Sequence, residues 1–81
     1  MKVKVTLENI KNGRKQDSFN CAIACALKDL HCEYPDVCDS NIEFRLNDKS
    51  YKIETPAEVA DWIFEFDKGK TVNPFEFELD I

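Results

Sequence analysis

The chain has 81 residues, enough for a single domain spanning residues 1–81, and it carries a formal net charge of −5. This charge argues against a general nucleic-acid binder, which presents a basic face, and against an anionic membrane surface as partner. The chain has neither an export-signal pattern nor an apolar run of about 18 residues, so we expect a protein of a reducing cytoplasm.

The N-terminal residues predict a strand followed by a turn. Over residues 1–7, apolar residues alternate with lysines and a threonine, which is typical of a half-buried strand. Residues 8–11 are compatible with one helical turn that ends at Asn12-Gly13, and residues 14–20 are predicted to be a polar loop.

A first helix is predicted over residues 21–30, with Asn20 or Cys21 at its N-cap. On a helical wheel, its core-facing stripe comprises Ile23, Ala26, Leu27 and Leu30. The segment 31–40 contains Pro35 and no periodicity, so we expect a loop there.

The C-terminal half predicts a hairpin, a helix and a strand. Alternation over 42–46 and 51–53 indicates the hairpin, and alternation over 75–81 indicates the last strand. Thr55 is the expected N-cap of the helix, with Glu58 completing a capping box and Gly69 ending the helix. The expected buried stripe of this helix is Val59, Trp62, Ile63 and Phe66.

These elements predict an α+β fold of order β-α-β-β-α-β. All four strands have one apolar and one charged face, which favours a mainly antiparallel four-stranded sheet with two helices packed on one face. Outward lysines on the first strand and outward acids on the last favour the pairing of these two strands.

The four cysteines follow the spacing C-x3-C-x6-C-x5-C, which has neither a C-x2-C knuckle nor an H-x3-H pair. We therefore expect no metal site and interpret the cysteines as small packing residues, with zinc as a minor alternative. A helix N-terminus lowers a thiol pKa, which makes Cys21 a candidate reactive thiol. His31 would lie roughly 15 Å away along the same helix, so no Cys/His catalysis is expected.

Small residues on the outward side of the first helix form a candidate surface for self-association. Cys21, Cys25 and Cys32 share this side, beside Ala22 and Ala24. Phe64, displaced from the buried stripe of the second helix, is a second candidate for such a surface.

The basic loop before the first helix is a candidate anion site. Backbone amides at a helix start, with basic side chains beside them, bind phosphate or carboxylate groups, and aromatic rings stack on a base. An ordinary solvated loop is the alternative. The candidate ligand-binding residues are Lys11, Arg14, Lys15, Phe19, Cys21, Ala22 and Tyr34.

Three stretches, VTLENIKNG, NCAIACAL and VADWIFEFDKGKTVNPFEFELDI, resemble a family of small proteins encoded by tailed bacteriophages. The family pattern has proline where this chain has Ala22. The resemblance implies phage origin and a host-cytoplasmic location, and it implies no assigned reaction. The matching positions are Val5, Thr6, Ile10, Gly13, Cys21, Ile23, Ala24, Ala26, Leu27, Phe66, Asp67, Gly69, Val72, Pro74, Phe75 and Phe77.

Together these features favour a non-catalytic, homo-oligomeric binding protein without a cofactor, and not an enzyme. By analogy with small phage antagonists, we expect it to sequester an anionic nucleotide-type immune signal of the host. One alternative is an inhibitor that binds a host or phage protein through its acidic strand face, Glu76-Glu78-Asp80. The other alternative is a thiol or zinc protein centred on Cys21.

Overall fold

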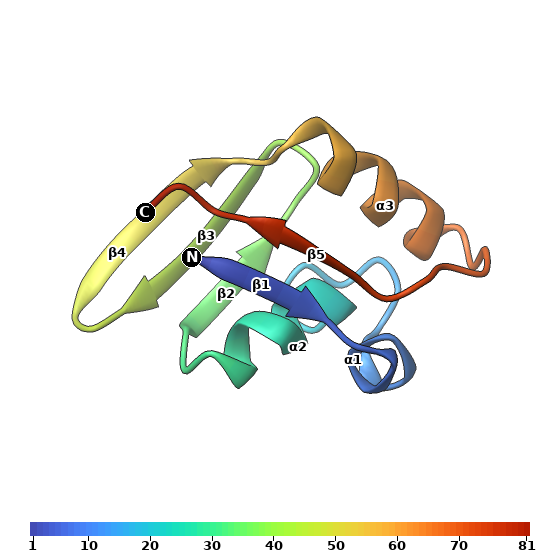
Figure 1. Cartoon of the computed structure of the whole chain (residues 1–81), viewed down its shortest axis with the longest axis horizontal. Coiled ribbons are helices and arrows are strands. Elements are labelled where there is room, and N and C mark those ends of the chain that lie inside the picture. Colours follow the sequence, from blue (N-terminus) through green and yellow to red (C-terminus); the bar gives the residue numbers. More distant parts are fainter.

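The computed structural model describes all 81 residues and has an α+β fold with three helices and five strands (Figure 1). None of the helices has the length and apolar character needed to cross a membrane. The strands form two antiparallel sheets, one of order β1-β5 and the other of order β2-β3-β4. The elements are β1 (Lys2–Val5), α1 (Leu7–Asn12), α2 (Ala22–Asp29), β2 (Glu33–Val37), β3 (Asn41–Leu46), β4 (Lys49–Glu54), α3 (Ala57–Asp67) and β5 (Phe75–Glu78).

The expected class is therefore confirmed, whereas the single four-stranded sheet with two helices is wrong. Both sheets contribute to one core: Val3 and Phe77 come from the small sheet, and Ile42 and Phe44 from the larger one. Alternation along a strand shows that one of its faces is buried. It does not show which strands share a sheet, because each face can be covered by a helix or by another sheet.

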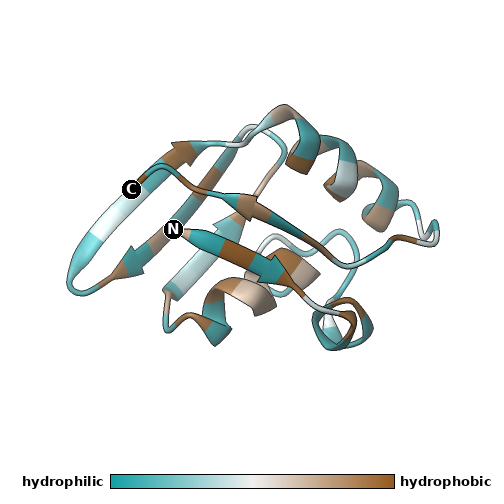
Figure 2. Ribbon diagram, in the orientation of Figure 1, coloured by the Kyte–Doolittle hydropathy of each residue, from teal (hydrophilic) through white to brown (hydrophobic).

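The predicted pairing of the first and last strands is confirmed. Val3 lies opposite Phe77 and Lys4 opposite Glu76, and the Lys2 Nζ atom lies 3.5 Å from a Glu76 carboxylate oxygen. Figure 2 shows the alternation of hydrophobic and hydrophilic residues along these strands. The N-terminal amino group donates to the Leu79 carbonyl at 2.7 Å, so the two ends of the chain lie side by side.

The segment expected to be a loop contains strand β2. Glu33 lies opposite Arg45 and Asp36 opposite Glu43, so two residues of β2, Tyr34 and Pro35, face a single residue of β3. This β-bulge breaks the alternating pattern that would have identified the strand. Pro35 is buried, and its missing N–H is tolerated at the bulge.

Helix α1 is longer than the single turn that the sequence suggested. The Thr6 hydroxyl accepts a hydrogen bond from the Asn9 amide at 3.1 Å, and the Asn9 side-chain oxygen accepts one from the Thr6 amide at 2.9 Å. This reciprocal capping box satisfies two amides at the helix start. The Asn9 side chain also donates to Asp29 at 2.9 Å, which ties α1 to the end of α2.

Helix α2 begins after Cys21 as expected, but the predicted outward stripe of small residues is wrong. Cys21 and Cys32 are each 5% exposed, and Ala22 and Ala24 are fully buried. The helix contacts α1, β1 and β2, so little of its surface reaches solvent. Its small side chains allow these elements of the same chain to approach closely, so most of the predicted small-residue surface is used within the chain, and Cys25 is its only partly exposed cysteine.

Helix α3 has the expected buried residues Val59, Ile63 and Phe66, whereas Trp62 is half-buried and stacks on Phe66 and Phe75. The expected capping box at its start is wrong. Pro56 occupies the N-cap, and the preceding residue, Thr55, donates its hydroxyl proton to the Cys38 carbonyl at 2.7 Å. The helix ends before Gly69, which has φ 77° as a terminating glycine requires.

Candidate functional site: an acidic groove

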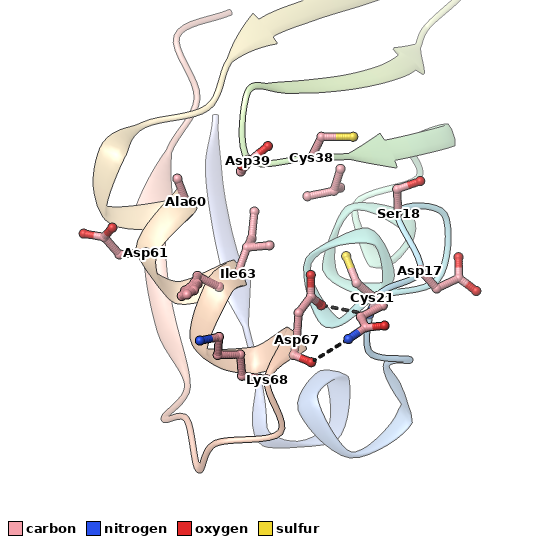
Figure 3. Close-up of a pocket in the computed structure, with 13 residues that line it drawn as sticks. Asp17, Ser18, Cys21, Cys38, Asp39, Ala60, Asp61, Ile63, Asp67 and Lys68 are labelled. Carbon is pink, nitrogen blue, oxygen red and sulfur yellow. Dashed lines mark hydrogen bonds between the residues drawn. The ribbon is translucent and has the colours of Figure 1, made fainter.

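A groove of about 840 Å³ lies between α3 and the segment before α2 (Figure 3). We call it the acidic groove. Residues 16–18 and Cys21 form one wall, residues 37–39 at the end of β2 form another, and α3 forms the third. The α3 residues that line it are Ala60, Asp61, Ile63, Phe64, Asp67 and Lys68.

The floor of the groove is apolar and its rim is acidic. Val37, Ile63 and Cys21 are buried in the core and line the groove from below. In Figure 3 the Cys21 sulfur and the Asp67 carboxylate point into the space between α3 and the loop, while Asp61 points away from this space on the outer side of α3. The charged side chains around the groove are those of Asp17, Asp39, Asp61, Asp67 and Lys68.

Hydrogen bonds between the loop before α2 and the end of α3 join two walls of the groove. The Asp67 carboxylate accepts a hydrogen bond from the Gln16 amide at 2.9 Å, and the Gln16 side chain donates to the Asp67 carbonyl at 3.4 Å. Gln16 has φ 58°, and these bonds hold it in that conformation. The Asp67 carboxylate is thus partly engaged within the chain.

Asp17 is ordered by the turn in which it lies. Its carboxylate accepts hydrogen bonds from the Phe19 and Asn20 amides at 3.1 and 3.2 Å and from the Asn20 side chain at 3.1 Å. The Asn20 side chain, followed by these amides, lowers the pKa of Asp17 below its ordinary value. The carboxylate therefore stays ionised at neutral pH.

The turn after β2 is held by hydrogen bonds to both sides. The Cys38 amide donates to the Asn41 carbonyl at 2.9 Å, and the Thr55 amide donates to the Ser40 carbonyl at 3.0 Å. With the Thr55 hydroxyl bond to the Cys38 carbonyl, these contacts place Asp39 opposite the start of α3. The sequence-based capping assignment of Thr55 therefore missed its actual role, which is to fix this wall of the groove.

Two carboxylates of the groove have no partner within the structure. Asp39 and Asp61 make neither a hydrogen bond nor an ion pair, and the only cation of the lining, Lys68, lies with its Nζ atom 4.3 Å from the centre of the Phe64 ring. The lining residues include four carboxylates and one ammonium group, and Arg14 lies close enough to Asp17 to help lower its pKa, so the least balanced negative charges of the groove are those of Asp39 and Asp61. Phe64 is 49% exposed and supplies an apolar surface at the same rim.

The expectation that the start of α2 activates the Cys21 thiol is wrong. Burial raises the pKa of Cys21 above its ordinary value and outweighs the stabilising amides of Ala24 and Ile23. Burial also raises the pKa of Cys32, and burial together with Asp36 raises that of Cys38. All four thiols are free, and no three side chains of the metal-binding types lie together.

The residues of the predicted anion site are separated by the fold. Cys21 and Ala22 are buried, and the Ala22 amide is covered by the backbone of Gly13, while Lys11, Arg14, Lys15, Phe19 and Tyr34 are exposed. Lys15 turns toward α3, where its Nζ atom lies 5.6 Å from the centre of the Phe66 ring. Tyr34 lies on the β2 bulge, so only the loop residues near Arg14 remain neighbours.

Sequence reasoning missed the acidic residues of the groove. Ala60, Asp61, Phe64, Asp67 and Lys68 follow the i, i+1, i+4, i+7, i+8 spacing of one helix face, and this pattern was available in the sequence. The sequence did not reveal the other two walls, because they depend on where the loop before α2 and the end of β2 pack against α3.

Searches against family models, curated proteins and solved structures find no match to this chain.

Proposed function

We propose that this chain is a non-catalytic binding protein whose acidic groove holds a basic, partly apolar segment of a partner protein. The observation that carries this proposal is the excess of aspartates over lysines, four to one, among the residues that line a groove with an apolar floor. A ligand that matches both features has a positive charge at the end of an apolar stem. Arginine and lysine side chains have this construction.

The size of the groove suits such a ligand. A volume of about 840 Å³ accommodates a few side chains of a peptide segment. Asp39 and Asp61 are free to pair with incoming cations, and a guanidinium group makes two parallel hydrogen bonds to a carboxylate. Phe64 and Ile63 offer apolar contacts for the stem of the same side chain.

The acidic groove is a better candidate than the acidic strand considered from the sequence. The strand residue Glu76 lies opposite Lys4 and 3.5 Å from the Lys2 ammonium group, and Glu78 lies opposite Lys2. The charge of the strand is therefore largely balanced within the sheet. In the phage context that the sequence resemblance implies, the partner would be a host or phage protein and this chain its inhibitor.

Selection from a displayed library of random 16-residue peptides tests the proposal. We expect the peptides retained by the protein to be rich in basic and aliphatic residues. Asp39→Asn and Asp61→Asn remove charges that have no internal partner, so each variant is expected to fold normally and to weaken the selected peptide about tenfold, the loss of one charge-assisted hydrogen bond.

The matched control is Asp80→Asn, which makes the same change in charge outside the groove and is expected to leave affinity unchanged. Selection of acidic peptides, or equal affinity of all three variants and the wild type, would contradict the proposal.

The nucleotide-type anionic ligand is the second candidate function. Lys11, Arg14 and Lys15 are exposed and make no ion pair in the structure, so their charges are available to a phosphate. A melting-temperature screen against cyclic and linear nucleotides tests it, combined with native mass spectrometry for subunit number. Stabilisation by a nucleotide that is lost in Arg14→Glu and Lys15→Glu supports it, and stabilisation that survives both charge reversals rejects this site.

A further inference from the structure

Strand β4 leaves one edge of the larger sheet open. The sheet has the order β2-β3-β4, so β4 pairs with β3 on one side only (Figure 1). This pairing is regular along the whole strand, from Lys49 opposite Leu46 to Glu54 opposite Asn41. The strand therefore has no bulge, and it contains no proline. A regular and uncovered edge of this kind is a template for a further strand.

The hairpin geometry determines which amides of β4 face the open edge. A two-residue loop places its flanking residues, Leu46 and Lys49, in a hydrogen-bonded pair, and such pairs alternate along an antiparallel ladder. The amides of the odd-numbered residues of β4 thus point toward β3, and those of Ser50, Lys52 and Glu54 point away from it. These three residues make no backbone hydrogen bond to any part of the chain outside the sheet. Each of them presents a free donor and a free acceptor.

The opposite edge of the same sheet is protected. Strand β2 contains Pro35 and a bulge, and the Val37 amide donates to the Ser18 carbonyl at 2.8 Å, so the loop before α2 covers the end of the strand. Proline, bulges and covering loops all prevent the addition of a strand. A sheet with one protected edge and one open edge accepts a second copy at the open edge only, which limits its assembly to a closed pair.

The charges of β4 make the strand complementary to a second copy of itself. A twofold axis through Ile53 places Lys52 of each copy opposite Glu54 of the other, in the positions where antiparallel strands exchange hydrogen bonds. The two half-buried Ile53 side chains then meet on the core face of the sheet. An axis through Lys52 would instead oppose two lysines, and an axis through residue 51 would oppose Asp48 and Glu54. Among these registers, opposite charges are paired only in the one centred on Ile53.

The strands of the smaller sheet lack this complementarity. The charged residues of β1 are both lysines, and those of β5 are both glutamates. Either strand paired with its own copy would place like charges opposite each other, which is destabilising. The mixed charges of β4 therefore distinguish it from the other strands as an interface between identical chains.

We propose that the chain forms a twofold homodimer through its β4 strands, in the register centred on Ile53, so that the two larger sheets join into one continuous sheet. The contact is short, and a dissociation constant on the order of 10–100 µM is expected for an interface of this size. No residue of β4 lines the acidic groove, so the dimer and the proposed function can each fail without the other.

Sedimentation equilibrium of the full chain at low salt, from about 5 µM to about 1 mM, tests the dimer. Lys52→Glu and Glu54→Lys each place two pairs of like charges across the twofold axis, so each variant is expected to weaken the dimer about tenfold. The double variant that carries both substitutions exchanges the charges and is expected to restore dimerisation. Both side chains are exposed, so the variants are expected to fold, which circular dichroism at low concentration checks.

Amide hydrogen exchange locates the contact in the wild type. The Lys52 and Glu54 amides are expected to become protected as the concentration rises, whereas the Tyr51 and Ile53 amides, which face β3, are protected throughout. A chain that stays monomeric up to about 1 mM would overturn the proposal. The same conclusion follows from a dimer that the single variants do not weaken, that the double variant does not restore, or that leaves the Lys52 and Glu54 amides unprotected.

Discussion

The absence of a side chain at Gly13 allows the end of α1 to approach the first turn of α2. A Cβ atom on Gly13 would lie 2.4 Å from the Ala22 nitrogen and 2.8 Å from the Asn9 carbonyl oxygen, and both are backbone atoms. The φ of Gly13 is −71°, which any residue adopts, so the requirement is for space alone. Gly69 is the opposite case: its φ is 77°, and a Cβ atom on it would meet only the flexible Lys15 side chain, at an ordinary contact distance of 3.7 Å.

We expect Gly13→Ala to lower the free energy of unfolding by about 3 kcal/mol, because the backbones of α1 and α2 must separate to admit the methyl group. Gly69→Ala is expected to cost about 1 kcal/mol through its positive φ. Urea denaturation measures both. A Gly13→Ala variant as stable as Gly69→Ala would contradict the close approach.

The buried Cys21 thiol is expected to make the free energy of unfolding decrease at alkaline pH. Its pKa is higher in the folded chain than in the unfolded chain, because burial disfavours the thiolate. The stability that the neutral thiol contributes is fully present below the unfolded value near 9.0 and is lost as the pH rises through the folded pKa. The free energy of unfolding of the wild type should therefore fall more steeply above about pH 9 than that of Cys21→Ala. Parallel pH profiles in denaturant titrations would show that Cys21 is not the titrating group.

At the scale of elements, the β3–β4 hairpin is the clearest case of local chemistry setting a register. Asn47 and Asp48 form its two-residue loop, with φ values of 52° and 64°. Positive φ at both positions is the type I′ geometry, whose twist matches that of the flanking strands. The loop is therefore shorter than the gap between the two alternating stretches, 42–46 and 51–53, that indicated the hairpin, and Lys49 and Ser50 belong to β4.

Asp48→Gly is expected to raise the free energy of unfolding by about 0.5–1 kcal/mol, because glycine adopts positive φ without strain. The ion pair that it removes, between Arg45 and Asp48 at 3.7 Å, is exposed and contributes little. Asp48→Ala, which removes the same ion pair but keeps a Cβ atom, should lower the melting temperature. Equal melting temperatures for the two variants would argue against the turn geometry.

At the scale of the whole molecule, the two ends of the chain close the core together. The small sheet joins β1 to β5, and the amide and carbonyl of Leu79 pair with Met1 at 2.8 and 2.7 Å. The Leu79 side chain is 1% exposed, although only two residues follow it. The C-terminal segment is therefore part of the core and not a tail.

We expect Leu79→Ala to lower the free energy of unfolding by about 3 kcal/mol, the usual result of a cavity left by a buried leucine. Ile81→Ala, two residues further on and 45% exposed, is expected to change it by less than about 0.5 kcal/mol. Thermal denaturation distinguishes them. Similar melting temperatures would show that the segment after β5 is not required for the core.

The sequence alone determined those helices and strands that neighbouring residues along the chain specify. Alternation identified β1, β3, β4 and β5, the Gly69 stop and the buried stripe located α3, and opposite charges predicted that β1 pairs with β5. It did not reveal β2, because the bulge at Tyr34 and Pro35 interrupts the alternation. Nor did it reveal the packing of α2, whose cysteines looked solvent-facing on a helical wheel and are covered by other elements.

The tertiary structure alone decided the candidate site. Asp39, Asp61 and Asp17 are far apart in the sequence and come together because the β2 turn, α3 and the loop before α2 border the same groove. In the predicted anion site, the basic loop residues Arg14 and Lys15 are exposed, as expected. The amide of Ala22, which the prediction placed beside them, is covered by Gly13. A helical wheel or a charge pattern describes one element at a time, whereas a groove is made of the surfaces that several elements leave uncovered when they pack.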